Sequence, residues 1–152
     1  MSKEVRLLDV DSFYHWDRFV LAHPQGSPFH LTRWQDLIVK NFRHTPYYLY
    51  RKCDGELTGV LPLVHVRSPL LGSVLVSTPY AVYGGMIANT EEDRLKIFEA
   101  AKDLAAKLNI KHIEFRNREP SEFDLPSVDL YHTFIKEIPE EEEECLLMIP
   151  RK

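Results

Sequence analysis

The middle of the chain alternates short apolar runs with turn residues, in a pattern that predicts a three-stranded antiparallel meander. Residues 57–67 form an apolar run rich in β-branched side chains, and similar runs at 46–53 and 73–78 flank it. Asp54-Gly55 and the Pro- and Gly-containing stretch 68–72 separate the runs with residues typical of turns. Because short connections join antiparallel neighbours, we expect the three strands to lie side by side.

Two amphipathic helices are expected before the meander. The first starts after Asp11 or Ser12 and runs to about residue 22, before a stretch with two prolines and a glycine. The second starts at Thr32, where Thr32 and Gln35 fit a capping box in which each satisfies an orphan amide of the first turn.

A third helix follows the meander. It begins at Thr90, with three carboxylates in its first turn, where they favour the positive end of the helix dipole. Asn109 is expected to end it as a left-handed cap, and residues 110–116 then form a strand. The expected apolar stripe of this helix is Leu95, Phe98, Ala101, Leu104, Ala105 and Leu108.

Two further strands complete the expected sheet, an edge strand at residues 4–8 and a last strand at residues 130–138. Pro139 followed by five glutamates is expected to start a helix with a solvated face. The predicted fold class is α/β (α+β), with a mixed, mainly antiparallel sheet of about six strands flanked by helices.

Length and charge limit the class of protein. At 152 residues the chain fits a single domain with a real core. It has no apolar run of the roughly 20 residues that span a bilayer, and no apolar signal-peptide core, so we expect no transmembrane segment and a cytoplasmic location. A net charge of -4 without a Lys/Arg cluster argues against a dedicated nucleic-acid binder and leaves a transient RNA partner open.

Several kinds of chemistry find no support in the residue pattern. The seven histidines are scattered and the two cysteines, Cys53 and Cys145, are far apart, so we expect no metal site. The chain lacks a G-x-S-x-G elbow. With only six glycines it also lacks a phosphate-cradling loop, so we expect no coenzyme A or nucleotide cofactor bound by this domain alone.

The loop after the third meander strand is the best candidate for substrate contact. It carries Tyr80, Tyr83, Gly84 and Gly85, which place two aromatic rings and a permissive backbone where a sheet edge meets solvent. The alternative is a tight turn whose tyrosines pack on the core.

Several short motifs, in order along nearly the whole chain, resemble one family. They are P-F-H-L-T-R-W at 28–34, G-V-L-P-L-V-H-V-R-S at 59–68, S-T-P-Y-A-V-Y-G-G at 77–85, I-E-F-R at 113–116 and L-L-M-I-P-R-K at 146–152. This order is similar to the amino-terminal half of FemAB-related acyltransferases, and within them to the branch associated with exosortase/PEP-CTERM systems.

The resemblance implies a two-domain protein in which both domains have the GNAT (acyl-CoA N-acyltransferase) fold. Residues 1–152 would be the first domain, because the family sequence normally continues into a second one. The better-known members transfer amino acids from aminoacyl-tRNA to a peptidoglycan precursor. The implied acyl donor of the full-length protein is therefore acyl-CoA or aminoacyl-tRNA. Its implied partners are the second GNAT-like domain, a cell-envelope precursor and a transient tRNA.

The resemblance also places the substrate groove along residues 83–89. The family pattern there ends in an acid, which Asn89 replaces with a group that donates as well as accepts. Trp34 matches a groove aromatic of some relatives, and its alternative is a core anchor of the second helix. Arg116 has a fork of donors for a phosphate or carboxylate, and its alternative is a salt bridge to a neighbouring glutamate. No catalytic residue is carried over.

Three functions stay open at this point, because fold alone does not choose between them. The first is the substrate-side half of an acyl or aminoacyl transferase, which has no appreciable activity as an isolated chain. The second is a complete one-domain acetyltransferase using acetyl-CoA. The third is a noncatalytic binding module, which would expose a large apolar surface and pair as a homodimer.

Overall fold

The computed structural model describes residues 5–68, 72–120, 123–128, 134 and 136–149. The chain divides into two units, Met1–Ser121 and Glu122–Lys152. The first unit holds the sheet, three of the helices and all the candidate site residues. Each unit is described by itself.

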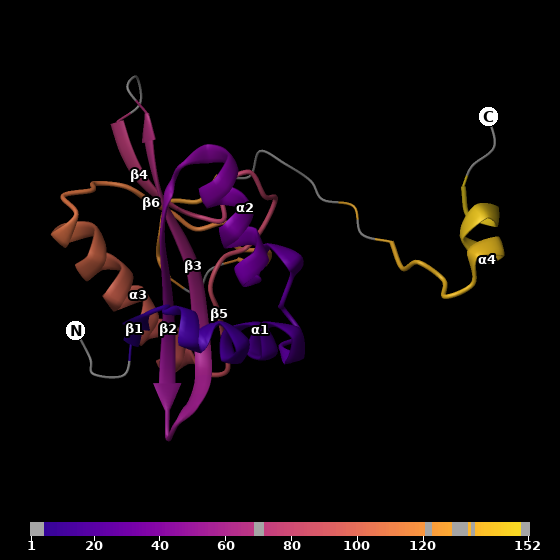
Figure 1. Ribbon diagram of the computed structural model, residues 1–152, viewed down its shortest axis with the longest axis horizontal. Helices are drawn as coiled ribbons and strands as arrows, with labels where there is room; N and C mark the ends of the chain where they lie inside the picture. Colours follow the sequence, from indigo (N-terminus) through magenta and orange to yellow (C-terminus); the bar gives the residue numbers. More distant parts are fainter. Residues whose placement is uncertain (1–4, 69–71, 121–122, 129–133, 135, 150–152) are drawn as a thin grey trace. The chain divides into compact units, whose positions relative to one another are not determined.

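The predicted meander is confirmed (Figure 1). It consists of β2 (Thr45–Cys53), β3 (Glu56–Ser68) and β4 (Gly72–Ser77), paired antiparallel in sequence order. Asp54 and Gly55 between β2 and β3 have φ of 50° and 88°, as a two-residue hairpin turn that follows the strand twist requires. The edge strand is confirmed as β1 (Val5–Leu7), which pairs antiparallel with β2.

Two short strands complete a mixed, mainly antiparallel sheet with the order β1-β2-β3-β4-β6. β6 (Ile113–Glu114) runs parallel to β4, and only these two residues of the predicted strand 110–116 are in it. β5 (Ile87–Ala88), which pairs with β3, is not predicted by the sequence pattern.

Pro62 lies in β3 between the part paired with β4 and the part paired with β5. Its carbonyl accepts from the Thr78 amide, 3.1 Å away. The proline nitrogen therefore faces a gap in the pairing, where a missing donor costs little. The only register shift between β2 and β3 in the described residues is at Arg51/Lys52, so Pro62 causes no bulge.

α1 (Phe13–Ala22) and α2 (Thr32–Phe42) cover one face of the sheet, each preceded by a short 3-10 turn, η1 (Val10–Ser12) and η2 (Pro28–His30). The Trp16 ring of α1 stacks on Tyr48 of β2, with ring centroids 5.2 Å apart. The core on this face consists of Trp16, Val20, Ile38, Tyr48, Tyr50, Val60, Val64 and Ile87.

The predicted capping box of α2 is wrong. Leu31 is the N-cap residue, and Thr32 is the first residue of the helix. The Thr32 amide and hydroxyl instead donate to the two carboxylate oxygens of Asp17 in α1, at 2.8 and 2.7 Å. A charged acceptor on a neighbouring helix is a stronger partner than a local amide, so a tertiary contact replaces the local one. α2 also ends before Pro46, at Phe42, with Arg43 as a left-handed cap.

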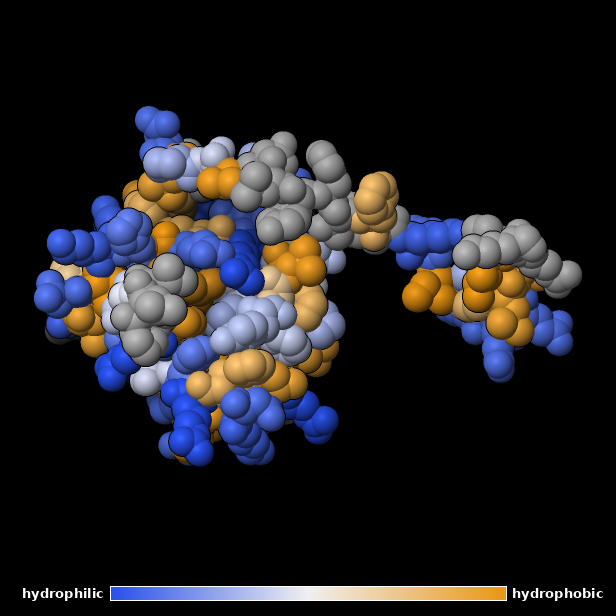
Figure 2. Space-filling model, turned by 90° about the horizontal axis from the view of Figure 1, so that it is seen from above, coloured by the Kyte–Doolittle hydropathy of each residue, from blue (hydrophilic) through white to orange (hydrophobic). Residues whose placement is uncertain are grey.

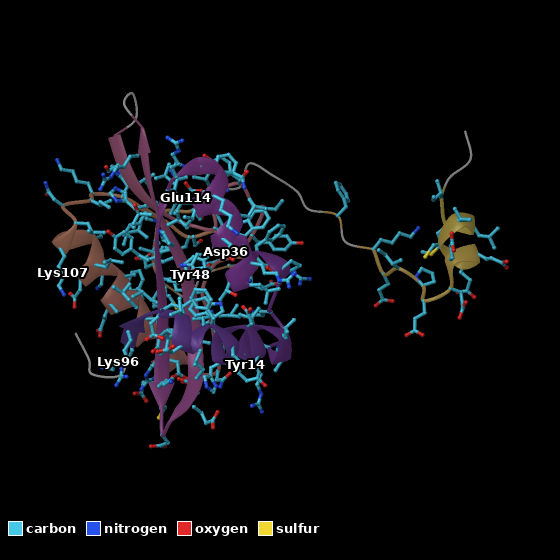
Figure 3. All side chains as sticks on the ribbon, viewed as in Figure 1. Tyr14, Asp36, Tyr48, Lys96, Lys107 and Glu114 are labelled. Carbon is cyan, nitrogen blue, oxygen red and sulfur yellow. The ribbon has the colours of Figure 1, made fainter. Side chains whose placement is uncertain are left out.

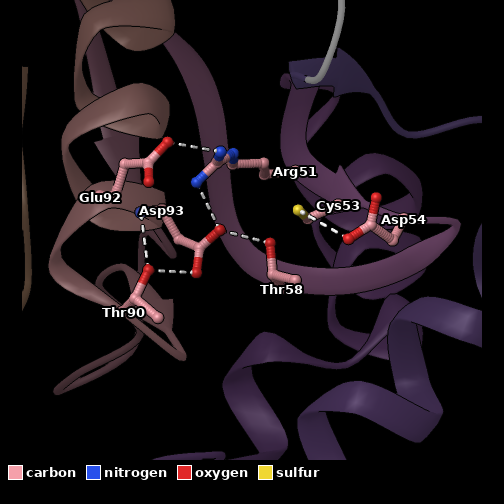
Figure 4. Close-up of polar contacts among 7 residues, drawn as sticks. All are labelled: Arg51, Cys53, Asp54, Thr58, Thr90, Glu92 and Asp93. Carbon is pink, nitrogen blue, oxygen red and sulfur yellow. Dashed lines mark hydrogen bonds and ion pairs between the residues drawn. The ribbon is translucent and has the colours of Figure 1, made fainter.

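α3 (Glu91–Lys107) covers the opposite face, and its predicted start is confirmed. The Thr90 hydroxyl accepts from the Asp93 amide at 3.1 Å. Asp93 is also the anchor of α3 on the sheet, because its carboxylate accepts from Arg51 Nη1 of β2 at 2.6 Å and from the Thr58 hydroxyl of β3 (Figure 4).

The predicted apolar stripe of α3 is partly wrong. Ala101 and Ala105 are buried as expected, but Leu95 is exposed. The buried face is Asp93, Ile97, Ala100, Ala101 and Ala105. Because the buried carboxylate of Asp93 fixes the rotation of the helix, the residues four, seven, eight and twelve positions further on share its face.

The second unit contains α4 (Glu142–Leu147), which starts in the glutamate run as predicted. Leu146 and Leu147 are exposed. Residues 129–133 and 135, which include the start of the predicted last strand at 130–138, lie outside the described residues. The described residues in that stretch, Phe134 and 136–138, are not in a strand.

Hydrophobic side chains reach the surface between charged ones on the face drawn in Figure 2. The exposed large hydrophobic residues of the first unit include Phe42, Tyr80 and Val82. Among the described residues, the helices are too short or too polar to cross a bilayer.

Candidate functional site

The candidate loop leaves β4 through a turn with an unusual backbone. Thr78 and Tyr80 have φ of 52° and 64°, in the left-handed region that bulky residues rarely adopt. The Ala81 amide donates to the Thr78 carbonyl and closes the turn. Thr78 itself is buried, and Tyr80 is 55% exposed. The loop therefore holds its backbone by burying Thr78 while presenting the Tyr80 ring to solvent.

Gly84 lies against this turn. A Cβ atom added to it would collide with the Thr78 side chain, and its own φ is 158°. Its amide donates to the Arg116 carbonyl at 3.0 Å. The absence of a side chain at Gly84 thus makes room for the buried Thr78. A side chain at this position would point at Thr78 and not into an open groove.

Gly85 is held from the other side by His30 of η2. The Gly85 carbonyl accepts from His30 Nε2 at 3.0 Å, and the Ser27 hydroxyl lies 2.8 Å from His30 Nδ1. A carbonyl can only accept, so Nε2 carries the proton and Nδ1 accepts from Ser27 in the neutral ring. Burial of the ring lowers the pKa of His30, partly offset by backbone carbonyls. The loop is therefore tied to η2 by an uncharged histidine.

Arg116 closes the base of the loop. Its amide donates to the Ser77 hydroxyl, and its Nη1 donates to the Ala81 carbonyl, both at 2.8 Å. Its Nε pairs with Glu114 at 2.7 Å. This pair is the salt bridge to a neighbouring glutamate that was the alternative role for Arg116. Arg116 makes it in addition to its bond to the Ala81 carbonyl of the loop. The Arg116 side chain as a whole is 31% exposed.

Tyr83 and Trp34 meet through a third ring. Phe29 of η2 packs edge-on against Trp34 of α2, with centroids 4.9 Å apart, and edge-on against Tyr83, at 5.9 Å. Trp34 also contacts the core. Its indole Nε1 is buried and has no hydrogen-bond partner among the described residues. A buried N–H without an acceptor is rare, so the Trp34 indole is an exception among the buried polar groups around the loop.

Tyr80 and Asn89 lie apart from this aromatic group. The Tyr80 ring packs on Phe42 and His44, at the end of α2 and before β2. The Asn89 amide donates to the Thr58 carbonyl of β3 at 2.8 Å, and its side chain is exposed beside the start of α3. The structure therefore brings Trp34, Tyr83, Gly84, Gly85 and Arg116 to one loop and its supports.

Sequence reasoning missed the residues that support the loop, namely Phe29, His30, Phe42, His44 and Thr78. Phe29 and His30 lie inside the motif at 28–34, so the motif marked the segment without showing which side chains matter. The contacts of Phe42 and His44 join segments 36 or more residues from Tyr80. Local patterning carries no signal for such contacts.

The start of α3 is occupied by its own acidic side chains. A helix N-terminus attracts anions, but here Glu91, Glu92 and Asp93 fill the first turn and the Thr90 hydroxyl occupies the Asp93 amide. Among the described residues, no group of three His, Cys, Asp or Glu side chains is placed to hold a metal ion. Cys53 and Cys145 are not joined in a disulfide.

Structural comparison shows the fold. FemX matches with a TM-score of 0.58 and 21% identity, over 70% of this chain and 25% of FemX. The ribosomal-protein-alanine N-acetyltransferase from Brucella melitensis matches with a TM-score of 0.55 and 11% identity, over 89% of this chain and 99% of that one. A GNAT family acetyltransferase from Staphylococcus aureus matches with a TM-score of 0.51 and 12% identity, over 88% of this chain and 97% of that one.

No family model and no curated protein sequence matches this chain. The chain spans about a quarter of the length of FemX. At these identities the likeness concerns the fold alone. The mixed, mainly antiparallel sheet with helices on both faces is the GNAT-like fold that the sequence predicts.

Proposed function

We propose that this chain is the acceptor-binding half of a two-domain acyl or aminoacyl transferase of the FemAB type. In this proposal it belongs to the exosortase-associated branch and acts on a cell-envelope precursor. The observation that carries the proposal is the match to FemX, in which 70% of this chain corresponds to only 25% of a longer protein.

The charge at the start of α3 supports a donor site outside this domain. Acyl-CoA and aminoacyl-tRNA both carry several phosphates. The exposed carboxylates of Glu91 and Glu92 in the first turn of α3 would oppose those phosphates, and among the described residues no other long helix of the first unit starts behind a glycine-rich loop. The proposal therefore gives donor binding to a second domain and leaves acceptor binding to this one.

The aromatic group beside the loop supplies the acceptor wall. Trp34, Phe29 and Tyr83 offer ring faces and edges, and the unpartnered Trp34 N–H is a donor for a peptide carbonyl. Gly84 and Gly85 shape the loop, and Arg116 holds its base with a side chain that is partly exposed and would pair with a carboxylate of the acceptor. Asn89 supplies an exposed amide where the family pattern has an acid. Tyr80 extends the same loop.

A second candidate is a one-domain acetyltransferase that uses acetyl-CoA. The observation that favours it is coverage, because the acetyltransferases from Brucella and Staphylococcus match over 97% or more of their own length. The acidic start of α3 opposes it.

The two tryptophans allow a test with an internal control. A muramyl pentapeptide is titrated into 15N-labelled protein, and the two indole N–H signals are followed. We expect a saturable shift of the Trp34 signal. Trp16 Nε1 already donates to the His30 carbonyl at 2.6 Å, so its signal should stay in place. A Trp34 signal that does not move would contradict the acceptor wall.

A further inference from the structure

Three aromatic rings from two distant segments form a cluster on the surface of the first unit. Tyr80 lies over Phe42 with ring centroids 4.0 Å apart and planes 19° apart. His44 is nearly parallel to Tyr80, with planes 5° and centroids 5.9 Å apart, and its Nε2 lies 3.0 Å from the Tyr80 hydroxyl. We call Phe42, His44 and Tyr80 the ring platform.

The platform has one open face. Phe42 covers one side of the Tyr80 ring at stacking distance, yet Tyr80 is still 55% exposed, so the opposite side of the ring faces solvent. The hydrogen bond joins Tyr80 and His44 at their edges and keeps their planes parallel. Tyr80 and His44 are therefore two nearly parallel rings joined through their polar atoms.

Backbone strain holds the platform in place. Tyr80 has φ of 64°, and Arg43, between Phe42 and His44, has φ of 56°. Left-handed backbone is unfavourable for both residue types, so the surrounding structure must enforce it. Arg43 has this backbone as the C-cap of α2, and Tyr80 has it in the turn that the Ala81 amide closes, so the fold fixes the backbone at both segments of the platform.

We propose that the ring platform binds a planar nitrogen heterocycle, and specifically the purine base of a nucleotide. Flat aromatic surfaces stack with nucleobases whatever their sequence, since each base has a π face. The two joined rings match a fused two-ring base better than a single-ring pyrimidine. A sugar fits less well, because the Tyr80 hydroxyl and His44 Nε2 are already bonded to each other and are not free to orient hydroxyl groups.

The charges next to the platform agree with a nucleotide. Lys40 lies in the last turn of α2, and Arg43 is its C-terminal cap. Both side chains are exposed. A phosphate attached to a stacked base therefore meets cationic side chains in the adjoining turn. This proposal does not rest on the transferase function, because the platform neither shares a contact with Trp34 nor needs a second domain.

The test is a chemical-shift titration of the full chain with AMP, UMP and methyl glucoside as probes. We expect AMP to bind more tightly than UMP, with shifts at Tyr80 and His44, and methyl glucoside to bind least. Tyr80→Ala should weaken AMP binding by roughly 5-fold to 100-fold, the range found when a stacking ring is removed. Tyr14→Ala is the matched control, since Tyr14 is also exposed but meets His15 edge-on at 75°.

Tyr80→Phe separates binding from folding. It keeps the stack on Phe42 and removes the hydrogen bond to His44, so AMP should still bind while its preference over UMP shrinks. Equal affinity of wild type and Tyr80→Ala for AMP would overturn the proposal. Tighter binding of methyl glucoside than of AMP, or no saturable AMP binding, would overturn it as well.

Discussion

Two polar regions of the first unit, the start of α3 and the 77–85 loop, are built in opposite ways. At the start of α3, the buried carboxylate of Asp93 collects Arg51, Thr58 and Thr90, and the charges are paired within the fold (Figure 4). At the 77–85 loop, the backbone is strained and the Trp34 N–H has no partner among the described residues, while the Tyr80 ring is exposed. Polar groups that are paired within the protein stabilise the fold, whereas polar groups and rings without a partner remain available to a ligand.

Asp93→Ala should give the largest loss of stability. The substitution leaves the Arg51 guanidinium buried without its main counter-charge and removes the carboxylate oxygen that accepts from the Thr90 hydroxyl, while the backbone cap bond from the Asp93 amide is kept. Breaking a buried pair from one side costs about 3–5 kcal/mol. Urea denaturation measures the loss. Glu92→Ala is the control, because Glu92 also contacts Arg51 but is 69% exposed, and it should cost about 1 kcal/mol or less. Equal effects of the two variants would contradict the anchor.

Gly84→Ala should destabilise the fold by about 1–3 kcal/mol, because the added methyl collides with Thr78. Gly84→Val should cost more, because a larger side chain enters the same space beside Thr78. The double variant Gly84→Ala, Thr78→Ala tests the mechanism. Removing the opposing side chain should restore part of the stability, and thermal melting of all variants reports it. Strictly additive losses would show that the collision is not the cause.

Acidification should weaken the loop support. Burial lowers the pKa of His30 below the ordinary value of 6.5, so the unfolded chain binds the proton first as pH falls. The stability from neutral His30 is thus complete above about pH 6.5 and is lost as pH falls toward the folded pKa, with a slope of at most about 1.4 kcal/mol per pH unit. His30→Gln should flatten this slope in urea denaturation at several pH values.

The slope should not vanish in that variant, because burial also lowers the pKa of His23 and of His65. An unchanged slope would mean that His30 does not carry the effect.

Trp34→Phe should have the smallest effect on stability, within about 0.5 kcal/mol. The ring contact with Phe29 is kept, and only an N–H without a partner is lost. Binding of the muramyl pentapeptide should nevertheless weaken. Trp16→Phe is the contrasting variant, because it removes a buried hydrogen bond to His30, and it should lower the melting temperature. A stable Trp34→Phe protein with unchanged peptide affinity would exclude the indole from the acceptor wall.

The parts of the fold set by neighbouring residues could be predicted from the sequence. The Asp54-Gly55 turn and the Thr90 cap depend on contacts within four residues, so residue type is enough to find them. The start of α2 could not be predicted, because its partner, Asp17, lies 15 residues away on another helix.

The candidate site was predictable only in outline. Its tyrosines and glycines are visible as a loop composition, and the motif order points to the FemAB-related family. The sequence does not show which of these residues support the fold and which are exposed, because this depends on Thr78 beside Gly84 and on Phe42 and His44 beside Tyr80. Likewise, a buried acid at the start of α3 shifts its apolar stripe by an amount that residue spacing does not reveal.

The most direct test of the central claim is acyl transfer by residues 1–152 alone. The chain is incubated with a muramyl pentapeptide and either acetyl-CoA or aminoacyl-tRNA, and product is followed by mass spectrometry. An acceptor half that binds the peptide and lacks a donor site predicts no product above the rate without protein, together with a saturable peptide-induced shift of the Trp34 signal. Steady turnover of either donor by this chain alone would contradict the account and favour a complete one-domain acyltransferase.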